Sequence, residues 1–393
     1  MSAVMKPSGA EADPILGRIL DPDGHLYMEP EVMKDLLREL LPHGGGFVLD
    51  FLERFAGSEE DKKLRARNRD NILAIKGISA LGSFNPSERA EALETVGIRS
   101  QIVFSNTVKL ETRQNTDEAR VVCRRVNDYA LDWQKKTRGR ARVACQINQG
   151  NVEWAYEELE RVLKAGALAV DLPCAQPPGG VSPAHETWDR FWAMLQEANV
   201  PALIHLGDGG LPYSKAPGDP MLPQQGWGDA AALRLKPAER SGGEEAVSPY
   251  YMLVAHIPAE VYLQVMVMGG VFERFPRLRF GILEFSTTWL GLACERMDTW
   301  SEFLAKVGKK YELKPSEFVR RNVRVGPFPT ENLPLLVERH GLKEVYCFST
   351  DYGHLEGSRD PIGKFRGMTD KIGAGYEEDF FVKNPSLLFP GLK

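Results

Sequence analysis

Carboxylate and imidazole side chains follow short apolar runs in this sequence, where they could bind a metal ion or transfer a proton. Asp23 and His25 come after the first run, and His205 lies near the end of a later one. Glu284 and Asp351 directly follow two further runs. If these runs are buried parallel strands, their carboxyl ends would bring the side chains together, as barrel enzymes do with their catalytic groups. Asp23 and His25 are two residues apart, so on a regular strand both point to the same face.

Each of these residues alone has a simpler interpretation. Asp351 could cap the helix that follows it, Asp23 could be a turn residue, and Glu284 could pair with a nearby arginine. A single histidine on a strand is often an ordinary core residue. Charged groups at the ends of apolar strands are costly, however, unless they are paired or bound to a metal. The joint pattern therefore favours a metal site formed by Asp23, His25, His205, Glu284 and Asp351.

Two more histidines are candidates for the same site. His256 lies in VAHIPAE with Glu260 one helical turn later, and could be a core histidine, a metal ligand or a substrate contact. His354 follows Asp351 by three residues, and could orient that carboxylate, contact substrate or begin a helix. The remaining histidines have polar helical or turn surroundings and are interpreted as surface residues: His43, His185 and His340.

The elements that would position these residues alternate between strand and helix. Periodicity predicts strands at 19–20, 99–104, 142–147, 167–172, 201–206, 278–283, 322–325 and 345–348. It predicts helices at 31–41, 47–55, 117–137, 152–165, 185–198, 248–275, 287–307 and 332–340. This alternation indicates a parallel sheet, and eight strands favour an α/β fold of the (β/α)8 TIM-barrel type. Neither GxGxxG after a strand nor GxxxxGK[ST] is found, which disfavours the common nucleotide-binding folds.

Two long segments interrupt the alternation without a change in composition that would mark a second domain. Residues 26–98 form a predicted helical insertion after the first strand. Residues 208–247, rich in Gly, Pro and charge, form a predicted lid loop after the fifth, since loops of this length are often functional. We expect a flexible tail at 1–15 and a single barrel domain at 16–393.

The composition is that of a soluble globular protein of 393 residues, 43% hydrophobic and 26% charged, with a net charge of -5. The absence of a Lys/Arg-rich run argues against a nucleic-acid partner. No apolar run is recognised as reaching the roughly 20 residues of a membrane span, and the N-terminus lacks a secretory signal. Five scattered cysteines without a CxxC pair predict buried thiols and a cytoplasmic location.

Taken together, these motifs resemble the amidohydrolase superfamily, in the branch related to aminocarboxymuconate-semialdehyde decarboxylase. The resemblance spans roughly residues 19–390. Its most specific pieces are DPDGHLYMEP (21–30), PALIHLGDGG (201–210), FERFPRLRFGILEFSTTWLGLACERMD (272–298), FSTDYGHLEG (348–357) and VKNPSLLF (382–389).

The resemblance implies metal ligands at Asp23, His25, His205 and Asp351. The sequence departs from the family pattern in two places. The first strand commonly carries His-x-His or Glu-x-His, where this chain has Asp-x-His, and Glu284 stands near the place of a frequent sixth-strand histidine. The fourth strand, ALAVDL, has no lysine that could be carbamylated to bridge two metals. Glu284 is then the candidate bridge, and His256 a candidate further ligand, for one or two Zn, Mn or Fe ions.

The resemblance also implies a reaction class. The first hypothesis is a metal-dependent hydrolase or non-oxidative decarboxylase acting on a small carboxylate- or carbonyl-bearing molecule, with Asp351 as general base. The alternative is a dinuclear Fe or Fe/Mn oxygenase, which the carboxylate-rich ligand set favours. A second alternative is a non-catalytic partner subunit, in which replacement of His25 would leave the activity of the assembly unchanged.

Further residues are expected around the substrate and between subunits. Trp289 could form a wall of the pocket, while Tyr213 and Trp227 on the lid could close over the substrate. A homo-oligomer, most simply a dimer, is expected, with the apolar helix at 248–275 as a candidate contact.

Overall fold

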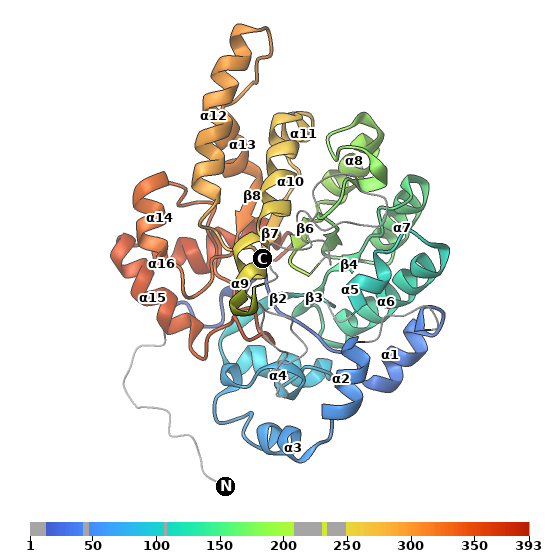
Figure 1. Cartoon of the computed structure of the whole chain (residues 1–393). Coiled ribbons are helices and arrows are strands. Elements are labelled where there is room, and N and C mark those ends of the chain that lie inside the picture. Colours follow the sequence, from blue (N-terminus) through green and yellow to red (C-terminus); the bar gives the residue numbers. More distant parts are fainter. Residues whose placement is uncertain (1–12, 42–46, 106–107, 208–229, 234–248, 393) are drawn as a thin grey trace.

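Short parallel strands lie at the centre of the molecule and helices surround them (Figure 1). The computed structural model describes residues 13–41, 47–105, 108–207, 230–233 and 249–392. The strands are β1 Ile19–Asp21, β2 Ile98–Val103, β3 Ala141–Val143, β4 Cys145–Gln146, β5 Val170–Leu172, β6 Ala202–His205, β7 Phe280–Leu283 and β8 Val323–Val325. The predicted parallel α/β fold is confirmed, while most of the predicted 1–15 tail and 208–247 lid lie outside the described residues.

The strands pair in chain order, in a three-stranded sheet β1-β2-β3 and a five-stranded sheet β4-β5-β6-β7-β8. Every neighbouring pair is parallel. The single strand predicted at 142–147 is divided at Ala144, whose N–H donates to the carbonyl of Val103 at 2.9 Å. Because only Ala144 separates β3 from β4, the two sheets are joined through one continuous segment.

The last predicted strand, 345–348, is not a regular strand in the structure. It runs beside β8 through one parallel bridge, between Tyr346 and Val325. Further along the same segment, Tyr352 forms a parallel bridge with Gly24, just beyond the end of β1. The segment that carries Asp351 therefore lies between β8 and the first strand.

The helices cover the outside of the strands. They are α1 Pro30–Leu37, α2 Phe47–Phe55, α3 Glu59–Ala66, α4 Pro86–Thr95, α5 Lys109–Thr112, α6 Asp117–Lys136, α7 Val152–Lys164, α8 Asp189–Ala198, α9 Pro249–Val254, α10 Ile257–Met268, α11 Val271–Arg274, α12 Leu290–Lys306, α13 Pro315–Asn322, α14 Leu333–His340, α15 Pro361–Ile372 and α16 Tyr376–Glu378. Short 3-10 turns are η2 Ile72–Ala74, η3 Gly77–Ser79, η5 Pro178–Gly180, η6 Glu186–Trp188, η7 Ala231–Leu233 and η9 Pro385–Leu388, and η8 Asp379–Lys383 is a π-helical turn. In the chain, helices α1 to α4 come between β1 and β2, which are neighbours in the sheet.

Side-chain caps start several of these helices where the sequence has short polar residues. Thr116 accepts a hydrogen bond from the N–H of Ala119 at the start of α6, and Asn151 accepts one from Trp154 at the start of α7. Such caps satisfy N–H groups that have no partner inside the helix. They fix the points at which the chain leaves each strand end and turns back along the outside of the sheet.

The predicted helix 248–275 is three helices, α9, α10 and α11. Pro258 stands in the first turn of α10, where a proline is favoured because its missing N–H has no helical partner there. Gly270 has a φ of +77°, a left-handed backbone conformation that interrupts the helix and separates α10 from α11. These backbone constraints divide a stretch whose apolar composition alone suggested one helix.

The stretch Pro249–Met268 reaches 20 residues with a mean hydropathy of 1.3 in its best window, long and apolar enough to cross a membrane. The expectation that no apolar run has this length is therefore wrong. Only 39% of that window is buried, and the half of α10 that is buried joins the main core through Tyr262, Leu263 and Met266. A helix that packs on a core passes the same test of length and composition.

Apolar side chains from the strands, from residues beside them and from the segment 388–389 form a small cluster of their own. It contains Leu20, Ile102, Phe104, Ala144, Ala169, Leu203, Leu283, Leu388 and Phe389. On β6, Leu203 belongs to this cluster, and His205 is two residues further along, so both side chains point to the same side. The interior cluster thus forms a floor beneath the candidate site.

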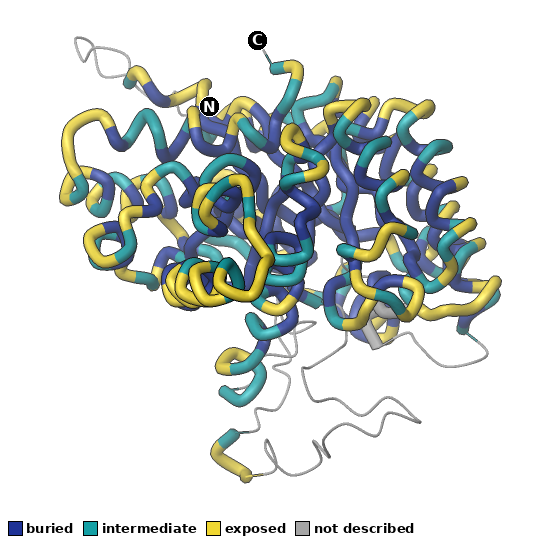
Figure 2. The backbone as a smooth tube through the Cα atoms, turned by 90° about the horizontal axis from the view of Figure 1, so that it is seen from above, coloured by how far each residue is buried: buried dark blue, intermediate teal, exposed yellow. Residues whose placement is uncertain are grey.

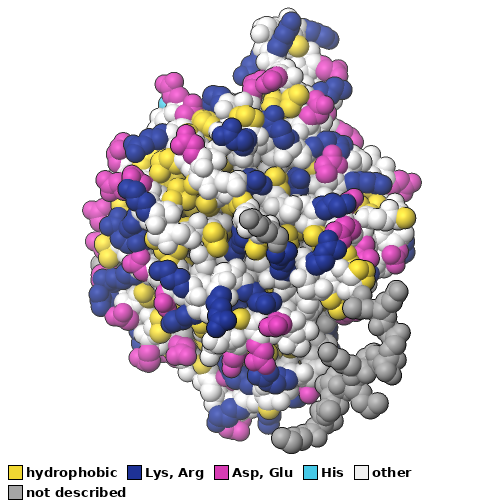
Figure 3. Space-filling view, turned by 180° about the vertical axis from the view of Figure 1, so that it is seen from behind, with side chains coloured by type: hydrophobic (Ala, Val, Ile, Leu, Met, Phe, Trp, Pro, Cys, Tyr) yellow, Lys and Arg dark blue, Asp and Glu magenta, His cyan; other side chains and the backbone are white. Residues whose placement is uncertain are grey.

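Burial is concentrated on the central strands, and the outer turns of the helices are exposed (Figure 2). The face seen in Figure 3 carries Lys, Arg, Asp and Glu side chains intermingled, with no large area of one charge. This distribution agrees with the near-balanced composition of 49 basic and 54 acidic residues.

Candidate metal centre

Six side chains from distant parts of the sequence converge at the strand ends. Two overlapping groups have ligand atoms within 4.8 Å of one another: Asp23, His25, His205 and Glu284 in one, and His25, Glu284, Asp351 and His354 in the other. All six residues are buried. The structure therefore brings together the five residues selected from the strand ends and adds His354 to them.

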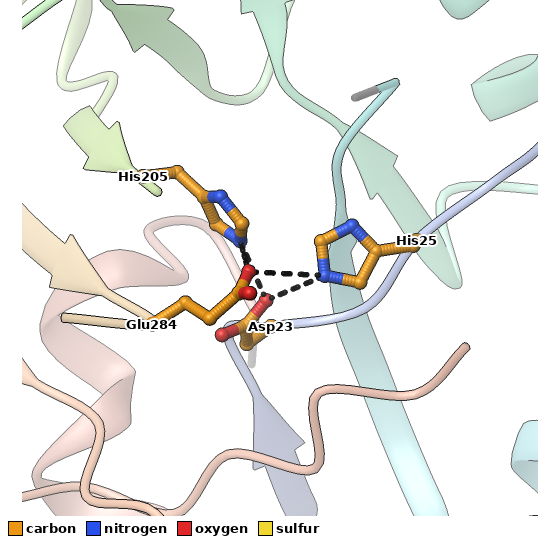
Figure 4. Close-up of side chains that lie close together, drawn as sticks. All are labelled: Asp23, His25, His205 and Glu284. Carbon is orange, nitrogen blue, oxygen red and sulfur yellow. Dashed lines mark hydrogen bonds and ion pairs between the residues drawn. The ribbon is translucent and has the colours of Figure 1, made fainter. Parts of the chain in front are cut away.

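The first group is centred on the imidazole of His205 and the carboxylates that face it (Figure 4). The Nε2 atom of His205 lies 3.1 Å from Asp23 Oδ1 and 3.0 Å from Glu284 Oε2. The Nε2 atom of His25 lies 3.4 Å from the same Asp23 oxygen and 3.7 Å from the same Glu284 oxygen. Two imidazole nitrogens and two carboxylate oxygens thus face a common point.

The second group uses the other oxygen of Glu284. Glu284 Oε1 lies 3.5 Å from His354 Nδ1, and this nitrogen is 3.2 Å from Asp351 Oδ1. Asp351 Oδ1 is also 3.1 Å from His25 Nε2. The rings of His25 and His354 are stacked with an interplanar angle of 14°. Glu284 therefore contributes one oxygen to each group.

The orientation of His205 is that of a metal ligand. Its Nδ1 lies 2.8 Å from the carbonyl oxygen of Leu206, which can only accept a hydrogen bond, so Nδ1 carries the proton. This directs Nε2 at the carboxylates, where its lone pair could bind a metal once this nitrogen is deprotonated; a backbone or carboxylate partner on the far nitrogen is usual for histidine ligands.

The electrostatics of the site call for a cation. Burial and the Lys109 ammonium lower the pKa of His205, but Glu284 and Asp23 outweigh them and raise it to about 9. Burial and Asp351 raise the pKa of Glu284, but His205 and His354 outweigh them and bring it to about 2. Buried carboxylates that stay ionised need positive partners. A divalent ion would supply that charge and leave the imidazoles neutral.

The donor set also fits a divalent metal chemically. Asp351 Oδ2 is buried and makes no hydrogen bond within the described part of the chain. Burial raises the pKa of Asp351, but the imidazoles of His354 and His25 outweigh it, so this carboxylate too is held ionised. Mixed imidazole and carboxylate ligation suits Zn, Mn and Fe.

Two of the candidate ligands have strained backbones. Glu284 has a φ of +62° and Asp351 a φ of +50°, a region that residues with a Cβ rarely adopt. Such strain persists only where the surroundings enforce it, and it clusters at functional sites. Each left-handed residue turns the chain sharply at its strand end and aims its carboxylate inward.

The turn after β7 is held by two side chains that sequence reasoning did not assign to this task. The carboxylate of Glu331 accepts hydrogen bonds from the N–H and the hydroxyl of Thr287, at 2.9 and 2.5 Å. The indole Nε1 of Trp289 donates to the carbonyls of Phe285 and Ser286, both at 3.0 Å. Trp289, expected to form a wall of the pocket, is thus a buried brace of the turn that carries Glu284.

A polar network beneath the site was also missed. Asp21 Oδ2 accepts hydrogen bonds from Gln101 Nε2 at 2.7 Å and from the Thr350 hydroxyl at 2.6 Å. The guanidinium of Arg89 donates to Gln101 Oε1 at 2.8 Å and to the backbone carbonyl of His25. The network ties β1 to the residue that precedes Asp351. Its only sequence signal is the presence of Asp21 and Thr350 next to the proposed ligands.

Gly24, between the two ligands of the first strand, allows this network to form. A Cβ atom at residue 24 would lie 2.5 Å from the side-chain amide of Gln101. The backbone of the Asp-Gly-His segment therefore rests directly on Gln101, and only glycine permits so close an approach.

The structure does not bring every candidate into the site. His256 belongs to neither ligand group; it is half-buried, with its ring 6.4 Å from that of Trp289 and its Nε2 3.8 Å from Glu260. Tyr213 and Trp227 lie outside the described residues.

The comparisons with known proteins concern the family and the fold. The model of the family described as Amidohydrolase matches residues 102–385. An amidohydrolase from Mycobacterium avium subsp. paratuberculosis is similar in structure, with a TM-score of 0.66, 19% identity, and coverage of 96% of this chain and 98% of that chain. These findings define an α/β protein with the fold of metal-dependent amidohydrolases. The chain belongs to the amidohydrolase family, which confirms the family predicted from its motifs.

Two decarboxylases are similar over almost their whole length. A structure of 5-carboxyvanillate decarboxylase from Novosphingobium aromaticivorans, complexed with manganese and 4-hydroxy-3-methoxy-5-nitrobenzoic acid, has a TM-score of 0.62 and 17% identity, and the match covers 94% of this chain and 95% of that chain. The 2,6-dihydroxybenzoate decarboxylase from Rhizobium has a TM-score of 0.61 and 15% identity, with 94% and 98% covered. At these identities the likeness establishes a shared fold.

The contact beneath Gly24 gives a first prediction. Gly24→Ala places a Cβ against Gln101, so we expect it to destabilise the protein by about 1–3 kcal/mol, as overpacking does. Chemical denaturation of metal-free protein measures this. Gly367→Ala is the matched control, because Gly367 lies in α15 with nothing near its Cβ position, and it should leave stability equal or higher. Equal stability of Gly24→Ala and wild type would contradict the packing described.

Proposed function

We propose that this chain is a metal-dependent lyase or hydrolase that acts on a small organic substrate bearing a carboxylate or carbonyl group. The observation that carries the proposal is the pair of overlapping buried ligand groups, which share His25 and Glu284 at the strand ends. Family membership and the manganese in the similar decarboxylase structure support it. Of the two reaction types, non-oxidative decarboxylation is favoured because two similar structures are decarboxylases, one of them complexed with a substituted benzoic acid.

We further propose that the strands close into a (β/α)8 barrel, with α1 to α4 as an insertion after the first strand and the segment after β6 as a lid. The bridges from β8 to Tyr346 and from Tyr352 to Gly24 support closure, because they continue the parallel order back to β1. In a closed barrel, the strand ends that carry the six site residues all face one mouth.

In this proposal Asp23, His25, His205 and Asp351 would hold metal, as the family pattern implies; the first three lie in one ligand group, and Asp351 lies in the second, which shares His25 with the first. A bound divalent metal would polarise a substrate oxygen or acidify a bound water. Asp351 takes a proton as general base, and the Nδ1 atom of His354, 3.2 Å from its Oδ1, orients that carboxylate. Burial of all these groups excludes bulk water, which strengthens every charge interaction among them.

Further residues are proposed to contact the substrate rather than the metal. The ring of His256 lies 6.4 Å from that of Trp289, which braces the turn after β7, and we propose that His256 contacts the substrate rather than the first ion. Tyr213 and Trp227 remain proposed lid contacts. The proposed partners are a small-molecule substrate and a second copy of the chain in a cytoplasmic homodimer, with neither nucleic acid nor membrane.

A second candidate function is a dinuclear oxygenase, and one observation favours it. Glu284 directs Oε2 to the group with His205 and Oε1 to the group with His354, which is the arrangement of a carboxylate that bridges two ions. Two ions including iron per chain would support oxygen activation. One Zn or Mn per chain would support the hydrolase or lyase.

Metal content tests the proposal directly. We expect protein purified without added metal to contain at least about one divalent ion per chain by elemental analysis. Dialysis against a chelator should remove this ion and abolish turnover of hydroxybenzoates or carboxyvanillates. Addition of Mn²⁺ should restore the turnover. A chain that binds no Mn²⁺, Zn²⁺ or Fe²⁺ after incubation with each would refute the metal-dependent function.

The role of Asp351 gives a separate prediction. In whichever reaction the wild type catalyses, Asp351→Asn should lower kcat by about 100-fold or more, because the amide cannot accept the proton. Asp360→Asn is the matched control, since Asp360 caps α15 and asparagine caps helices equally well. A kcat within threefold of wild type for Asp351→Asn would exclude Asp351 as the base.

A further inference from the structure

A buried lysine lies directly behind the metal ligand His205. Lys109, the first residue of α5, is 1% exposed. Its Nζ donates to the backbone carbonyls of His205 at 3.3 Å and Leu206 at 3.2 Å, and lies 3.3 Å from Asp171 Oδ2. An ammonium group has three N–H donors. Two of them are directed at carbonyls at the end of β6, and the ammonium also forms an ion pair with Asp171 on β5.

One of these partners is shared with the ligand itself. The carbonyl oxygen of Leu206 accepts from Lys109 Nζ and also from His205 Nδ1, at 2.8 Å. The Lys109 ammonium thus holds the carbonyl oxygen of Leu206 in place, and this oxygen in turn orients the imidazole ring of His205. With Nδ1 held in this way, Nε2 is aimed at Asp23 and Glu284, 3.1 and 3.0 Å away.

An aromatic ring completes the support on the same side. The ring of Phe104 lies 5.6 Å from Lys109 Nζ and 4.2 Å from the centre of the His205 ring. The face of an aromatic ring attracts a cation. Phe104 therefore contacts both the ammonium and the imidazole, and limits tilting of the ligand ring.

The charge of Lys109 is not fully balanced by Asp171, because this carboxylate also pairs with a second cation. Asp171 also lies 3.0 Å from Arg113 Nη2 through its other oxygen. Removal of the lysine charge would leave the Asp171–Arg113 pair neutral. A buried ammonium is costly to place, and an apolar side chain would fill the same volume at lower cost. Packing alone therefore does not account for a lysine at this position.

We propose that Lys109 is a positioning residue that sets the orientation and metal affinity of His205 by anchoring the carbonyls at the end of β6. The inference rests on the proposed metal-dependent function. Lys109 does not touch the ion or the substrate; it acts through Leu206 and the imidazole. Partners of this kind, one step removed from the metal, typically change metal affinity or activity by about 10- to 100-fold when replaced.

The test is the affinity of the full-length, metal-stripped chain for Mn²⁺, measured by titration calorimetry, together with the unfolding temperature of the same metal-free protein. We expect Lys109→Met to weaken Mn²⁺ binding by about 10-fold or more. Lys136→Met is the matched control, because Lys136 is exposed and pairs with Asp132 on the surface of α6. Its Mn²⁺ affinity should equal that of wild type.

A purely structural role would lower the unfolding temperature without changing Mn²⁺ affinity, so the two readouts separate the roles. If Lys109→Met does not unfold cooperatively, Lys109→Gln is measured instead. The glutamine amide keeps an N–H donor, so the Mn²⁺ affinity of this variant should lie between those of wild type and Lys109→Met. Affinity within threefold of wild type in the variant measured overturns this inference alone. A wild-type chain that binds no Mn²⁺ overturns the proposed function and the inference together.

Discussion

The confinement of three carboxylates and three imidazoles in one buried volume is the constraint on which the rest of the site depends. Asp23, Glu284 and Asp351 are held ionised by imidazoles that face them, despite burial that opposes ionisation. Such a set is costly unless a cation balances it. A bound divalent ion would balance the carboxylate charges and allow the imidazoles to act as neutral ligands.

The scaffold maintains this cluster through strain and through hydrogen bonds that never reach the ion. Glu284 and Asp351 take left-handed backbone conformations that turn their carboxylates inward. Glu331 holds the turn after Glu284, and Asp21 ties the first strand to the residue before Asp351. Interactions of this kind keep ligands in place before the metal binds, which lowers the entropy that binding must overcome. Glu284 directs one carboxylate oxygen toward His205 and the other toward His354, so its position links the two ligand groups.

Much of the fold and the site could be predicted from local pattern. Alternating apolar runs and amphipathic helices indicated parallel strands with their ligands at one end, and five strand-end residues, Asp23, His25, His205, Glu284 and Asp351, do converge. The prediction of a single helix over 248–275 failed because Pro258 and Gly270 act on the backbone, while composition reports only hydrophobicity. The sequence also could not show whether His256 lies with the other candidate ligands, because its neighbours in the chain do not reveal the direction of its ring.

The sequence by itself determined the types of the candidate ligands, the apolar runs that carry them and the family to which the chain belongs. Tertiary structure alone decided which distant residues support those ligands. Lys109 and Asp171 are 62 positions apart in the chain, and no local period relates them, yet they form an ion pair of 3.3 Å behind His205. Periodicity reports on which face a residue lies, within one element. Contacts between elements depend on how the strands and their loops pack in three dimensions, which no local pattern encodes.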